Sequence, residues 1–599
     1  MTTQTLRRRS SSRPIKPAVK REEDGSRILR SQPQPARVAQ KKDATLRIIP
    51  LGGMEEVGRN MTVFEYGRDI VILDMGIQFP EEDMPGIDYI IPNINYLKGK
   101  EKNIRAIIFS HGHLDHIGAA PILLEKLGYP PIIGRDLTLA FVKKRLEDYQ
   151  ANSAKKLKTI SIKSVSDRFS LGKFNIGFFE VEHSIMDAVG VIINSPCGTI
   201  VHPGDWTMEK DPESGRLLTY EYLAKLPSPK ILMLESLGAT DFRTETVSEK
   251  EMYENLERLI WEAPGRVIIG TFSSQIKRIG RLLEYAEKIG KKVALDGYSM
   301  KMNVEIAKQL GYIKIARGAL ISVSEIHKHP DNKVIVICTG AQGEGNAVLS
   351  RIISDNHKYI KIQKNDTIIF SSSVIPGNER TIQRLKDSLY RKCDNVVHTE
   401  IMDVHTSGHS NAQNIKEIIK QIHPDFFLPV YANHYFLKEA TKLAVEIGMP
   451  KDRIFVLDNG SIIEFDKNGE VKILSKKVDT SYVFVDGLGI GDVGQVVLRD
   501  RQAMAQDGMF VIIVTVDSQT GEVRNSPDII SRGFIYMRES KELLYQVRER
   551  VKEIVRRAAG HQAPINHDLI KDNIRDKIGQ FLYTKTERRP MVLPVVIEV

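Results

Sequence analysis

The chain has 599 residues, of which 41% are hydrophobic and 27% are charged, and its formal net charge is +10. This length exceeds what one core supports, since single cores stop growing near roughly 250–300 residues, so we expect several domains. No apolar run approaches the roughly 20 residues that span a bilayer, and no apolar stretch follows the N-terminal arginines. We therefore expect a cytoplasmic protein without a membrane segment or a secretory signal.

The basic excess is concentrated at the N-terminus. Residues 1–42 carry a net charge of +9, which leaves +1 for the rest of the chain. Residues 1–45 are rich in Arg, Lys, Ser, Pro and Gln and cannot bury enough apolar surface to offset ordering, so we predict a disordered tail. Two roles stay open for it: a solubilising or localising tail, or an arm that holds a polyanion.

From Leu46 onward, short apolar runs alternate with longer amphipathic stretches. The runs RIIPLGG, VILDMG and RAIIFSHGH are typical of strands, and PILLEKLG and LTLAFVKKRLEDY of helices. Later strand-like segments are GTIVHPGDW, KILMLES, RVIIGTFSS, KVIVICTG, DTIIFSSS and FFLPVYA. This alternation predicts a layered α/β architecture. From about Val485 the pattern changes to a helix (SKELLYQVRERVKEIVRRA) and an apolar strand (MVLPVVIEV), which predicts a separate small α/β domain.

Any metal in this chain must be held by histidine and carboxylate. The three cysteines, Cys197, Cys338 and Cys393, are too few and too far apart for a disulfide framework or a Cys-rich zinc site. In contrast, three histidines and one aspartate crowd into SHGHLDH (110–116), directly after a strand-like run. Such groups would repel or desolvate one another without a cation. Imidazole and carboxylate together suit Zn²⁺ or Mn²⁺.

The H-x-H-x-D-H string resembles the signature of the metallo-β-lactamase superfamily. The resemblance implies two metal ions, one held by His111, His113 and His183 and the other by Asp115 and His116, with Asp205 between them. It also implies that Asp74, at an earlier strand end, orients these ligands. Zn²⁺ is the expected ion and Mn²⁺ an alternative. The superfamily includes thioester hydrolases and lactonases, so the metal site does not name the substrate.

Longer segments resemble bacterial ribonuclease J, a nuclease with an inserted β-CASP domain, and the resemblance covers nearly all of the chain after residue 45. Its segments are LGGMEEVGRNM (51–61), FPEEDMPGIDYIIPNINYL (79–97), GTFSSQIKRI (270–279), ICTGAQGEGNAVLSR (337–351), SSSVIPGNE (371–379), HTSGHS (405–410), VDGLGIGDVGQVVLRDR (485–501), PDIISRGFIYMRES (527–540) and FLYTKTERRPMVLPVVIEV (581–599). It implies a metallo-β-lactamase αββα sandwich with an inserted β-CASP α/β domain and a small C-terminal α/β domain. The expected boundaries are 1–45 for the tail, 46–240 and 386–478 for the two parts of the sandwich, 241–385 for the β-CASP domain, and 479–599 for the C-terminal domain.

The resemblance also implies a pocket for the RNA backbone and its 5′-monophosphate. Its expected residues are Gly340, Gln342, Gly343, Glu344, Ser372, His405, Ser407, Gly408, His409 and Phe272. Glycines allow backbone N–H groups to approach a phosphate closely, and Phe272 could stack on a base. Without the resemblance, a tight turn after a buried strand would explain the glycines, and a core aromatic would explain Phe272. Asp115, Glu235 and His409 are the expected catalytic residues, with the Glu–His pair serving as a general acid.

The chain departs from the family at two places. The family has P-V-H-G-E where this chain has PVYAN, so Tyr431 replaces a histidine ligand of the second metal. We predict that His434 takes over as ligand; the alternatives are a second metal that is weakly held, exchanges, or is absent. At residues 235–238, Glu-Ser-Leu-Gly stands where the family has an Asp- or Glu-Ser-Thr string.

These observations predict a ribonuclease that acts on single-stranded RNA, as a 5′→3′ exonuclease and an endonuclease, in RNA degradation and maturation. The resemblance further implies a homodimer or homotetramer and membership of an RNA-degradation complex. A DNA nuclease or a small-ester hydrolase on the same fold remains an alternative. A catalytically inactive RNA-binding subunit also remains an alternative. The replacement of a ligand by Tyr431 favours this alternative, and the otherwise intact set of metal ligands argues against it.

Overall fold

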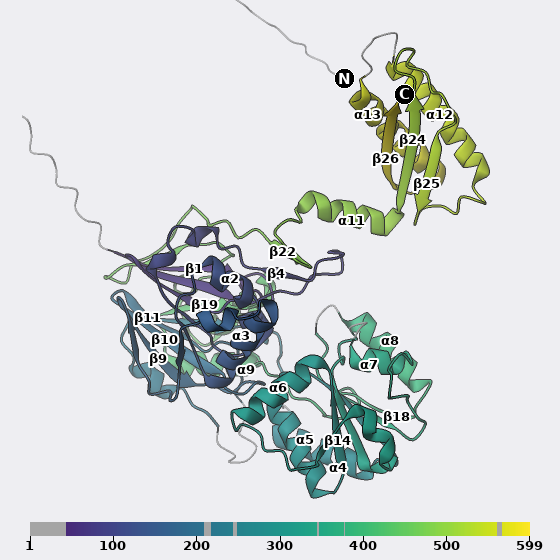
Figure 1. Cartoon of the computed structure of the whole chain (residues 1–599). Helices are drawn as coiled ribbons and strands as arrows, with labels where there is room; N and C mark the ends of the chain where they lie inside the picture. The colour runs from purple at the N-terminus through teal and green to yellow at the C-terminus, as the bar shows by residue number, and fades with distance from the viewer. Residues whose placement is uncertain (1–43, 209–216, 244–247, 344–346, 376–377, 560–565) are drawn as a thin grey trace, which may run out of the picture. The chain divides into compact units, whose positions relative to one another are not determined.

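The computed structural model describes residues 44–208, 217–243, 248–343, 347–375, 378–559 and 566–599 (Figure 1). The predicted tail therefore lies outside the described residues except for its last two positions, and so does Glu344. Among the helices of the described segments, none combines the length and the apolar character that crossing a bilayer requires.

Two sheets form the first part of the fold. The larger has eight strands in the order β21-β20-β1-β2-β3-β5-β6-β7. Its bounds are β1 (Leu46–Gly52), β2 (Met61–Tyr66), β3 (Asp69–Leu73), β5 (Ile104–Ile108), β6 (Ile132–Gly134), β7 (Thr159–Ser161), β20 (Ile463–Phe465) and β21 (Val471–Ile473). The smaller has six strands in the order β19-β12-β11-β10-β9-β8. Its bounds are β8 (Phe169–Leu171), β9 (Phe174–Glu180), β10 (Val189–Ser195), β11 (Gly198–His202), β12 (Lys230–Glu235) and β19 (Phe426–Val430).

The two sheets face each other across a shared core. Phe64 and Val71 of the larger sheet and Phe178 and Val191 of the smaller sheet belong to one buried cluster. Helices cover the outer faces: α1 (Leu114–Ile117), α2 (Ala120–Lys126) and α3 (Asp136–Tyr149) follow strands of the larger sheet, and α9 (Ala412–Ile422) and α10 (His434–Glu446) flank β19. Side chains of α2 and α3 join a cluster with the larger sheet, and those of α9 and α10 join one with the smaller. This is the predicted αββα sandwich.

A third sheet is inserted between β12 and α9. Its six strands are all parallel, in the order β15-β14-β16-β13-β17-β18. Its elements are α4 (Glu249–Glu262), β13 (Val267–Thr271), α5 (Ile276–Lys288), β14 (Lys292–Asp296), α6 (Tyr298–Gln309), β15 (Leu320–Ile321), β16 (Val334–Cys338), α7 (Val348–Ile353), β17 (Thr367–Ser371), α8 (Glu379–Tyr390) and β18 (Asn395–Val397). Its central strands are buried on both faces, which is why their sequences are continuously apolar.

The expected domain boundaries stay predictions, and two strand pairings cross them. Strand β18 pairs with β17, so the inserted sheet continues past residue 385, where we expected the sandwich to resume. The strand β22 (Val483–Asp486) pairs with β4 (Tyr89–Ile91) and with β23 (Gly489–Ile490), so the chain beyond residue 479 still contributes to a sheet with the N-terminal half. Local composition does not report these pairings, because each depends on a partner strand elsewhere in the chain.

The C-terminal domain contains a three-stranded sheet in the order β25-β24-β26, with its own apolar core. Its elements, with the preceding helix, are α11 (Gln495–Asp507), β24 (Met509–Val516), β25 (Asp528–Arg532), α12 (Lys541–Ala559), α13 (His567–Thr586) and β26 (Met591–Glu598). Side chains of α12 and α13 pack against one face of the sheet. This matches the small α/β domain that the sequence predicts.

Candidate metal centre and predicted pocket residues

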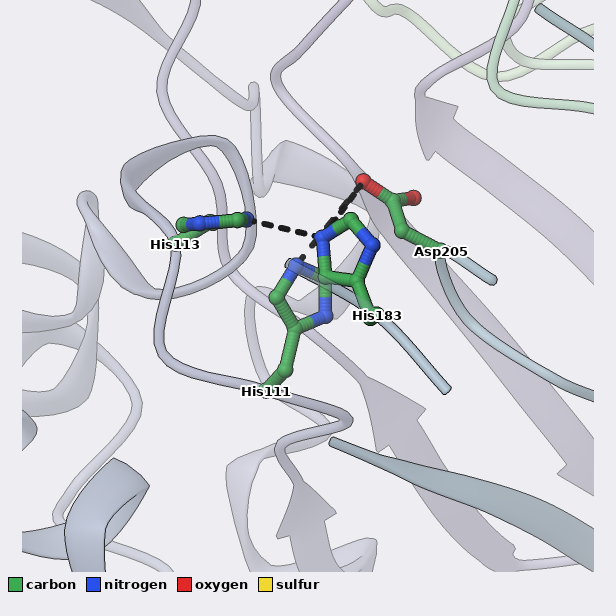
Figure 2. A group of neighbouring side chains, drawn as sticks. All are labelled: His111, His113, His183 and Asp205. Carbon is green, nitrogen blue, oxygen red and sulfur yellow. Dashed lines mark hydrogen bonds and ion pairs between the residues drawn. The ribbon is translucent and has the colours of Figure 1, made fainter. Parts of the chain in front are cut away.

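Four ligand-type side chains converge beyond the ends of three strands. His111 and His113 follow β5, His183 follows β9, and Asp205 follows β11. Their donor atoms all lie within 4.8 Å of one another, and Figure 2 shows how the four residues come together from separate segments. Nε2 of His183 is 3.0 Å from Nδ1 of His113, and Asp205 Oδ2 is 3.8 Å from Nε2 of His111. We call these four residues the first group.

Hydrogen bonds fix which ring nitrogens of the first group carry lone pairs. Nδ1 of His183 lies 2.6 Å from the carbonyl oxygen of Gly408, which only accepts, so its Nε2 carries a lone pair. The Ser110 hydroxyl donates to Asp74, at 2.9 Å, and accepts from Nδ1 of His111, at 3.0 Å. Nε2 of His111 therefore also carries a lone pair, and it is buried without a hydrogen-bond partner. A bound cation would give this lone pair of His111 a partner.

The imidazoles of the first group are neutral near pH 7. Burial lowers the pKa of His113 to about 4 and that of His183 to about 3. Burial and the nearby His116 hold the pKa of His111 well below its ordinary value. Neutral imidazole is the form that binds metal, so three imidazoles and one carboxylate fit a divalent ion such as Zn²⁺.

A second group shares Asp205 with the first. It consists of Asp115, His116 and Asp205, and its donor atoms again lie within 4.8 Å of one another. Nε2 of His116 is 3.3 Å from Asp205 Oδ1 and 3.4 Å from Asp115 Oδ2, while its Nδ1 is 2.8 Å from Asp74. Burial opposes protonation of His116, but Asp205 and Asp115 outweigh it and raise the His116 pKa well above the usual value. The carboxylates of Asp115 and Asp205 thus favour a positive charge at the position of the second group.

The predicted ligand His434 is not part of the second group. It begins α10, and its Nδ1 lies 3.4 Å from Glu55, in a separate half-exposed cluster with Asp458. Asp458 is already paired with Lys477. The arrangement therefore gives no support to His434 as a replacement ligand, because the chain turns after β19 and the new helix carries this residue to the Glu55 side.

Tyr431, directly after β19, lies beside the second group instead. Its ring centroid is 5.4 Å from that of His116 and 5.0 Å from that of His202, and its hydroxyl is buried without a partner. Burial raises the Tyr431 pKa well above 10. Sequence reasoning did not single out His202 or Asn60, whose Nδ2 lies 3.0 Å from Nε2 of His116. His202 stands in the same HPGDW string as Asp205, and this neighbourhood could have revealed it.

The predicted acid pair lies next to the first group. Glu235 ends β12, and its Oε2 is 3.8 Å from Nδ1 of His409, while the His409 ring centroid is 5.5 Å from that of His183. Burial opposes protonation of His409, but the facing Glu235 carboxylate raises its pKa to about 9. Gly408 must be small here, since a Cβ would come within 2.6 Å of the Ser184 hydroxyl.

Predicted pocket residues follow neighbouring strands of the inserted sheet. Phe272 follows β13, Gln342 follows β16, and Ser372 follows β17, which are adjacent in the sheet order β16-β13-β17. Loops at the carboxyl ends of parallel strands are where α/β sheets bind ligands. Gly340 and Gly343 have φ angles of 106° and 80°, which only glycine adopts without strain.

The Gln342 side chain holds two of these loops together. Its Nε2 donates to the carbonyl oxygen of Ser373 at 2.6 Å and lies 3.5 Å from the Ser372 hydroxyl, and its Oε1 accepts from the backbone of Ile375 at 2.8 Å. The Gln342 amide is therefore already hydrogen-bonded to the loop after β17, and it positions that loop. Ser407 is exposed, and its hydroxyl bonds to the backbone of His409.

A buried arginine that sequence reasoning missed stands beside His405. Nη1 of Arg278, on α5, is 2.7 Å from Nδ1 of His405 and 3.0 Å from the carbonyl oxygen of Ser371. Burial and this guanidinium hold the pKa of His405 well below its ordinary value. The neutral ring accepts at Nδ1 and keeps an N–H at Nε2, and its centroid is 6.3 Å from that of Phe272. A cation and a ring N–H suit an anionic ligand.

Family models match the three parts of this fold in order. The metallo-beta-lactamase superfamily matches residues 54–243, the ribonuclease J beta-CASP domain matches residues 264–389, and the ribonuclease J C-terminal domain matches residues 496–599. The fold and the His/Asp groups thus define a metallo-β-lactamase protein of the β-CASP branch.

Curated relatives specify the family. Ribonuclease J2 of Bacillus subtilis (strain 168) is 36% identical over 560 residues, which cover 93% of this chain and 100% of that protein. Ribonuclease J 1 of Streptococcus pyogenes serotype M3 is 34% identical and is covered to 97%, against 92% of this chain. Ribonuclease J 2 of Staphylococcus aureus (strain MRSA252) is 34% identical over 93% of this chain and 99% of its own length. The chain belongs to the ribonuclease J family.

A solved structure, of a protein of unknown function from Enterococcus faecalis V583, covers 72% of this chain at 16% identity and a TM-score of 0.49. This likeness is too loose to bear on the fold or the site.

Proposed function

We propose that this chain is a metal-dependent ribonuclease that hydrolyses single-stranded RNA, as a 5′→3′ exonuclease and as an endonuclease, in RNA degradation and maturation. One observation carries the proposal: two ligand groups share Asp205 and lie beside the Glu235–His409 pair. Two divalent ions bound there would supply a deprotonated water near neutral pH and offset the charge that develops on the phosphate.

The chain's own residues would orient this chemistry. Asp74 accepts from both Ser110 and His116, and so aims one histidine of each ligand group. Water attacks phosphorus, and the bond from phosphorus to the leaving 3′ oxygen breaks. His409 is the proposed proton donor to that oxygen, because Glu235 keeps it protonated up to about pH 9. The released nucleotide then carries a 5′-monophosphate and a 3′-hydroxyl.

The pocket on the inserted domain is the proposed seat of the RNA 5′-monophosphate. Arg278 would supply the positive charge, His405 an N–H donor, and Phe272 a surface for base stacking. A 5′ phosphate bound here would fix the position of the RNA strand relative to the metal centre. It would thereby place the first phosphodiester of the RNA at the first group. Endonuclease cleavage does not require a free 5′ end of the RNA and would use the same metal centre.

Two other functions remain candidates. A DNA nuclease on this fold would cleave the deoxy version of the same oligonucleotide as well as the ribo version. A catalytically inactive RNA-binding subunit would bind RNA without cutting it; Tyr431 favours this reading, and the complete first group opposes it.

The deciding experiment is cleavage of one single-stranded RNA prepared with 5′-monophosphate, 5′-triphosphate and 5′-hydroxyl ends, with Mn²⁺ or Zn²⁺, beside Asp115→Ala. We expect mononucleotides from the monophosphate substrate, and none from the variant or after chelation. Internal cuts without end preference would contradict the pocket assignment. Absence of cleavage with either metal would contradict the enzyme assignment and favour the inactive subunit.

We further propose that the chain assembles as a homodimer or homotetramer and takes part in an RNA-degradation complex. The exposed face of the C-terminal sheet supports self-association, because Ile530 on β25 and Leu593 and Val595 on β26, the two strands on either side of β24, are about 40% exposed. Light scattering of the wild type and of Val595→Lys would test this; a monomeric wild type would contradict it. The cytoplasmic location stays a prediction.

A further inference from the structure

The two ligand groups differ in the kind of atoms they offer. The first group presents three imidazole nitrogens and one carboxylate. The second group presents one imidazole, that of His116, and two carboxylates, one of which is the shared Asp205. Imidazole-rich sites favour Zn²⁺, whereas carboxylate-rich sites favour harder ions such as Mn²⁺ and Mg²⁺. The difference between the groups therefore predicts a difference between the ions that they prefer.

Tyr431 lies beside the second group, between the rings of His116 and His202, whose centroids are 5.4 Å and 5.0 Å from its own. Its side chain is 3% exposed, and its ring packs against the ring of His116. The ring also lies close to Gly53, since a Cβ built on Gly53 would come within 2.8 Å of Tyr431 Cδ1. A neutral phenol is a poor metal ligand, so Tyr431 adds no strong donor atom beside His116.

The nearby nitrogen-bearing side chains do not complete the second group. Nδ1 of His202 accepts a hydrogen bond from the Gly204 N–H at 2.9 Å, so the proton of the neutral ring is on Nε2, which is then a donor and no ligand. The Asn60 amide lies against Nε2 of His116. His434 is in the separate cluster with Glu55. Among the described residues, the second group thus has a single ligand nitrogen.

We propose that this chain retains one ion tightly at the first group and exchanges a second, harder ion, Mn²⁺ or Mg²⁺, at the second group, and that Tyr431 sets this asymmetry. The proposal rests on the metal centre of the proposed function. It adds that Zn²⁺ alone does not fill both groups at low free concentration. Turnover would then respond to the free Mn²⁺ or Mg²⁺ concentration while the tightly held ion stays in place.

The test is the metal content of the full-length protein, measured without RNA. The protein is loaded with Zn²⁺, dialysed exhaustively against metal-free buffer, and analysed for zinc per chain. Mn²⁺ is then titrated in and followed by the loss of its free-ion magnetic resonance signal. We expect about one zinc to be retained per chain and one further Mn²⁺ to bind reversibly.

Three variants assign the asymmetry to Tyr431. Tyr431→His adds a nitrogen beside the second group, so we expect its Zn²⁺ affinity there to rise by at least about tenfold, enough for two zinc ions to survive dialysis. Tyr431→Phe keeps the ring and removes the hydroxyl; we expect the wild-type metal content. His434→Ala, the matched control, should also retain the wild-type content.

Each other outcome overturns the proposal. Two zinc ions retained by the wild type would show that the groups are equally tight. Loss of the second ion in Tyr431→Phe would make the hydroxyl a ligand, and loss in His434→Ala would make that histidine one. If Tyr431→His does not fold, the wild-type and Tyr431→Phe results still decide. A protein that binds neither ion would also contradict the proposed function, whereas RNA cleavage with two tight zinc ions would contradict this inference alone.

Discussion

A single buried carboxylate organises both ligand groups. Asp74 is fully buried and accepts hydrogen bonds from the Ser110 hydroxyl and from Nδ1 of His116. Through Ser110 it also orients His111. Asp74 has a φ angle of 62°, a conformation that non-glycine residues rarely adopt, so the turn after β3 holds it under strain. In this conformation the Asp74 carboxylate lies where it orients the rings of both His111 and His116.

Replacing Asp74 should therefore weaken metal binding although Asp74 touches no metal. We expect Asp74→Ala to lower the metal affinity of the two ligand groups by about 10- to 100-fold. His116 loses its hydrogen-bond partner, and His111 is held less firmly because Ser110 loses the acceptor that orients it. Competition with a chromophoric chelator would measure this. Asp69→Ala, at the other end of β3, is the control, since its partner is Arg105. Equal affinity in Asp74→Ala and the wild type would refute the role.

The Glu235–His409 pair predicts a pH dependence. His409 donates its proton only below its pKa, which Glu235 raises to about 9. In Glu235→Gln the facing charge is gone and burial remains, so the His409 pKa falls and the alkaline limb of the cleavage profile moves to lower pH. Rates from pH 6 to 10 at saturating metal would show it, with zinc content as the control. An unmoved alkaline limb would exclude His409 as the acid.

At the scale of elements, helix α9 holds the loop that carries His409. Asn411 is its N-cap: its side chain accepts from the Asn414 N–H at 2.9 Å, and the Asn414 side chain accepts in return from the Asn411 N–H. This capping box fixes where the chain enters the helix, two residues after His409. The adjoining Gly408 approaches His183 closely, so the loop position matters to the first group.

Loss of this cap should loosen the loop. Replacing an Asn N-cap with Ala costs about 1 kcal/mol, so we expect amides in the first turn of α9 to exchange about fivefold faster in Asn411→Ala. Hydrogen exchange followed by mass spectrometry would detect it. Gln413→Ala, an exposed change in the same turn, should leave the exchange rates as in the wild type. The idea fails if both variants behave alike.

At the scale of the whole chain, separate cores predict unfolding in more than one step. The C-terminal core is a cluster of its own, distinct from the inter-sheet core and from the core on one face of the inserted sheet. A further cluster joins side chains of the inserted domain, such as Ile269, with side chains of the sandwich, such as Phe141. Within the inserted domain, Arg266 and Asp366 form a buried ion pair at 2.6 Å that joins the starts of β13 and β17. Such a pair is costly to break because it leaves one buried charge without a partner.

Asp366→Ala should therefore destabilise the inserted domain by about 3–5 kcal/mol and leave the C-terminal domain, which has its own core, unaffected. Differential scanning calorimetry should show one transition at a lower temperature and the C-terminal transition unchanged. The double variant Arg266→Met/Asp366→Leu removes both charges and should restore much of the lost stability. A uniform shift of every transition would contradict the separation into cores.

The sequence by itself determined the ligand types of the first group and the strands that carry them. SHGHLDH follows an apolar run, and the loop after such a strand brings His111 and His113 together by short-range geometry alone. The parallel strands of the inserted sheet were also readable, because burial on both faces makes them continuously apolar. In contrast, the strand β24 is equally apolar in sequence, yet alternate residues are only partly buried.

The tertiary structure decided what depends on distant segments. The pairings of β18 with β17 and of β22 with β4 cross the boundaries expected at residues 385 and 479. The path of the chain after β19 took His434 away from the second group and left Tyr431 against His116. Arg278 acquired its role only because α5 brings it to His405. Sequence spacing fixes neighbours within a loop, but the meeting of side chains from separate strands follows from packing of the whole fold.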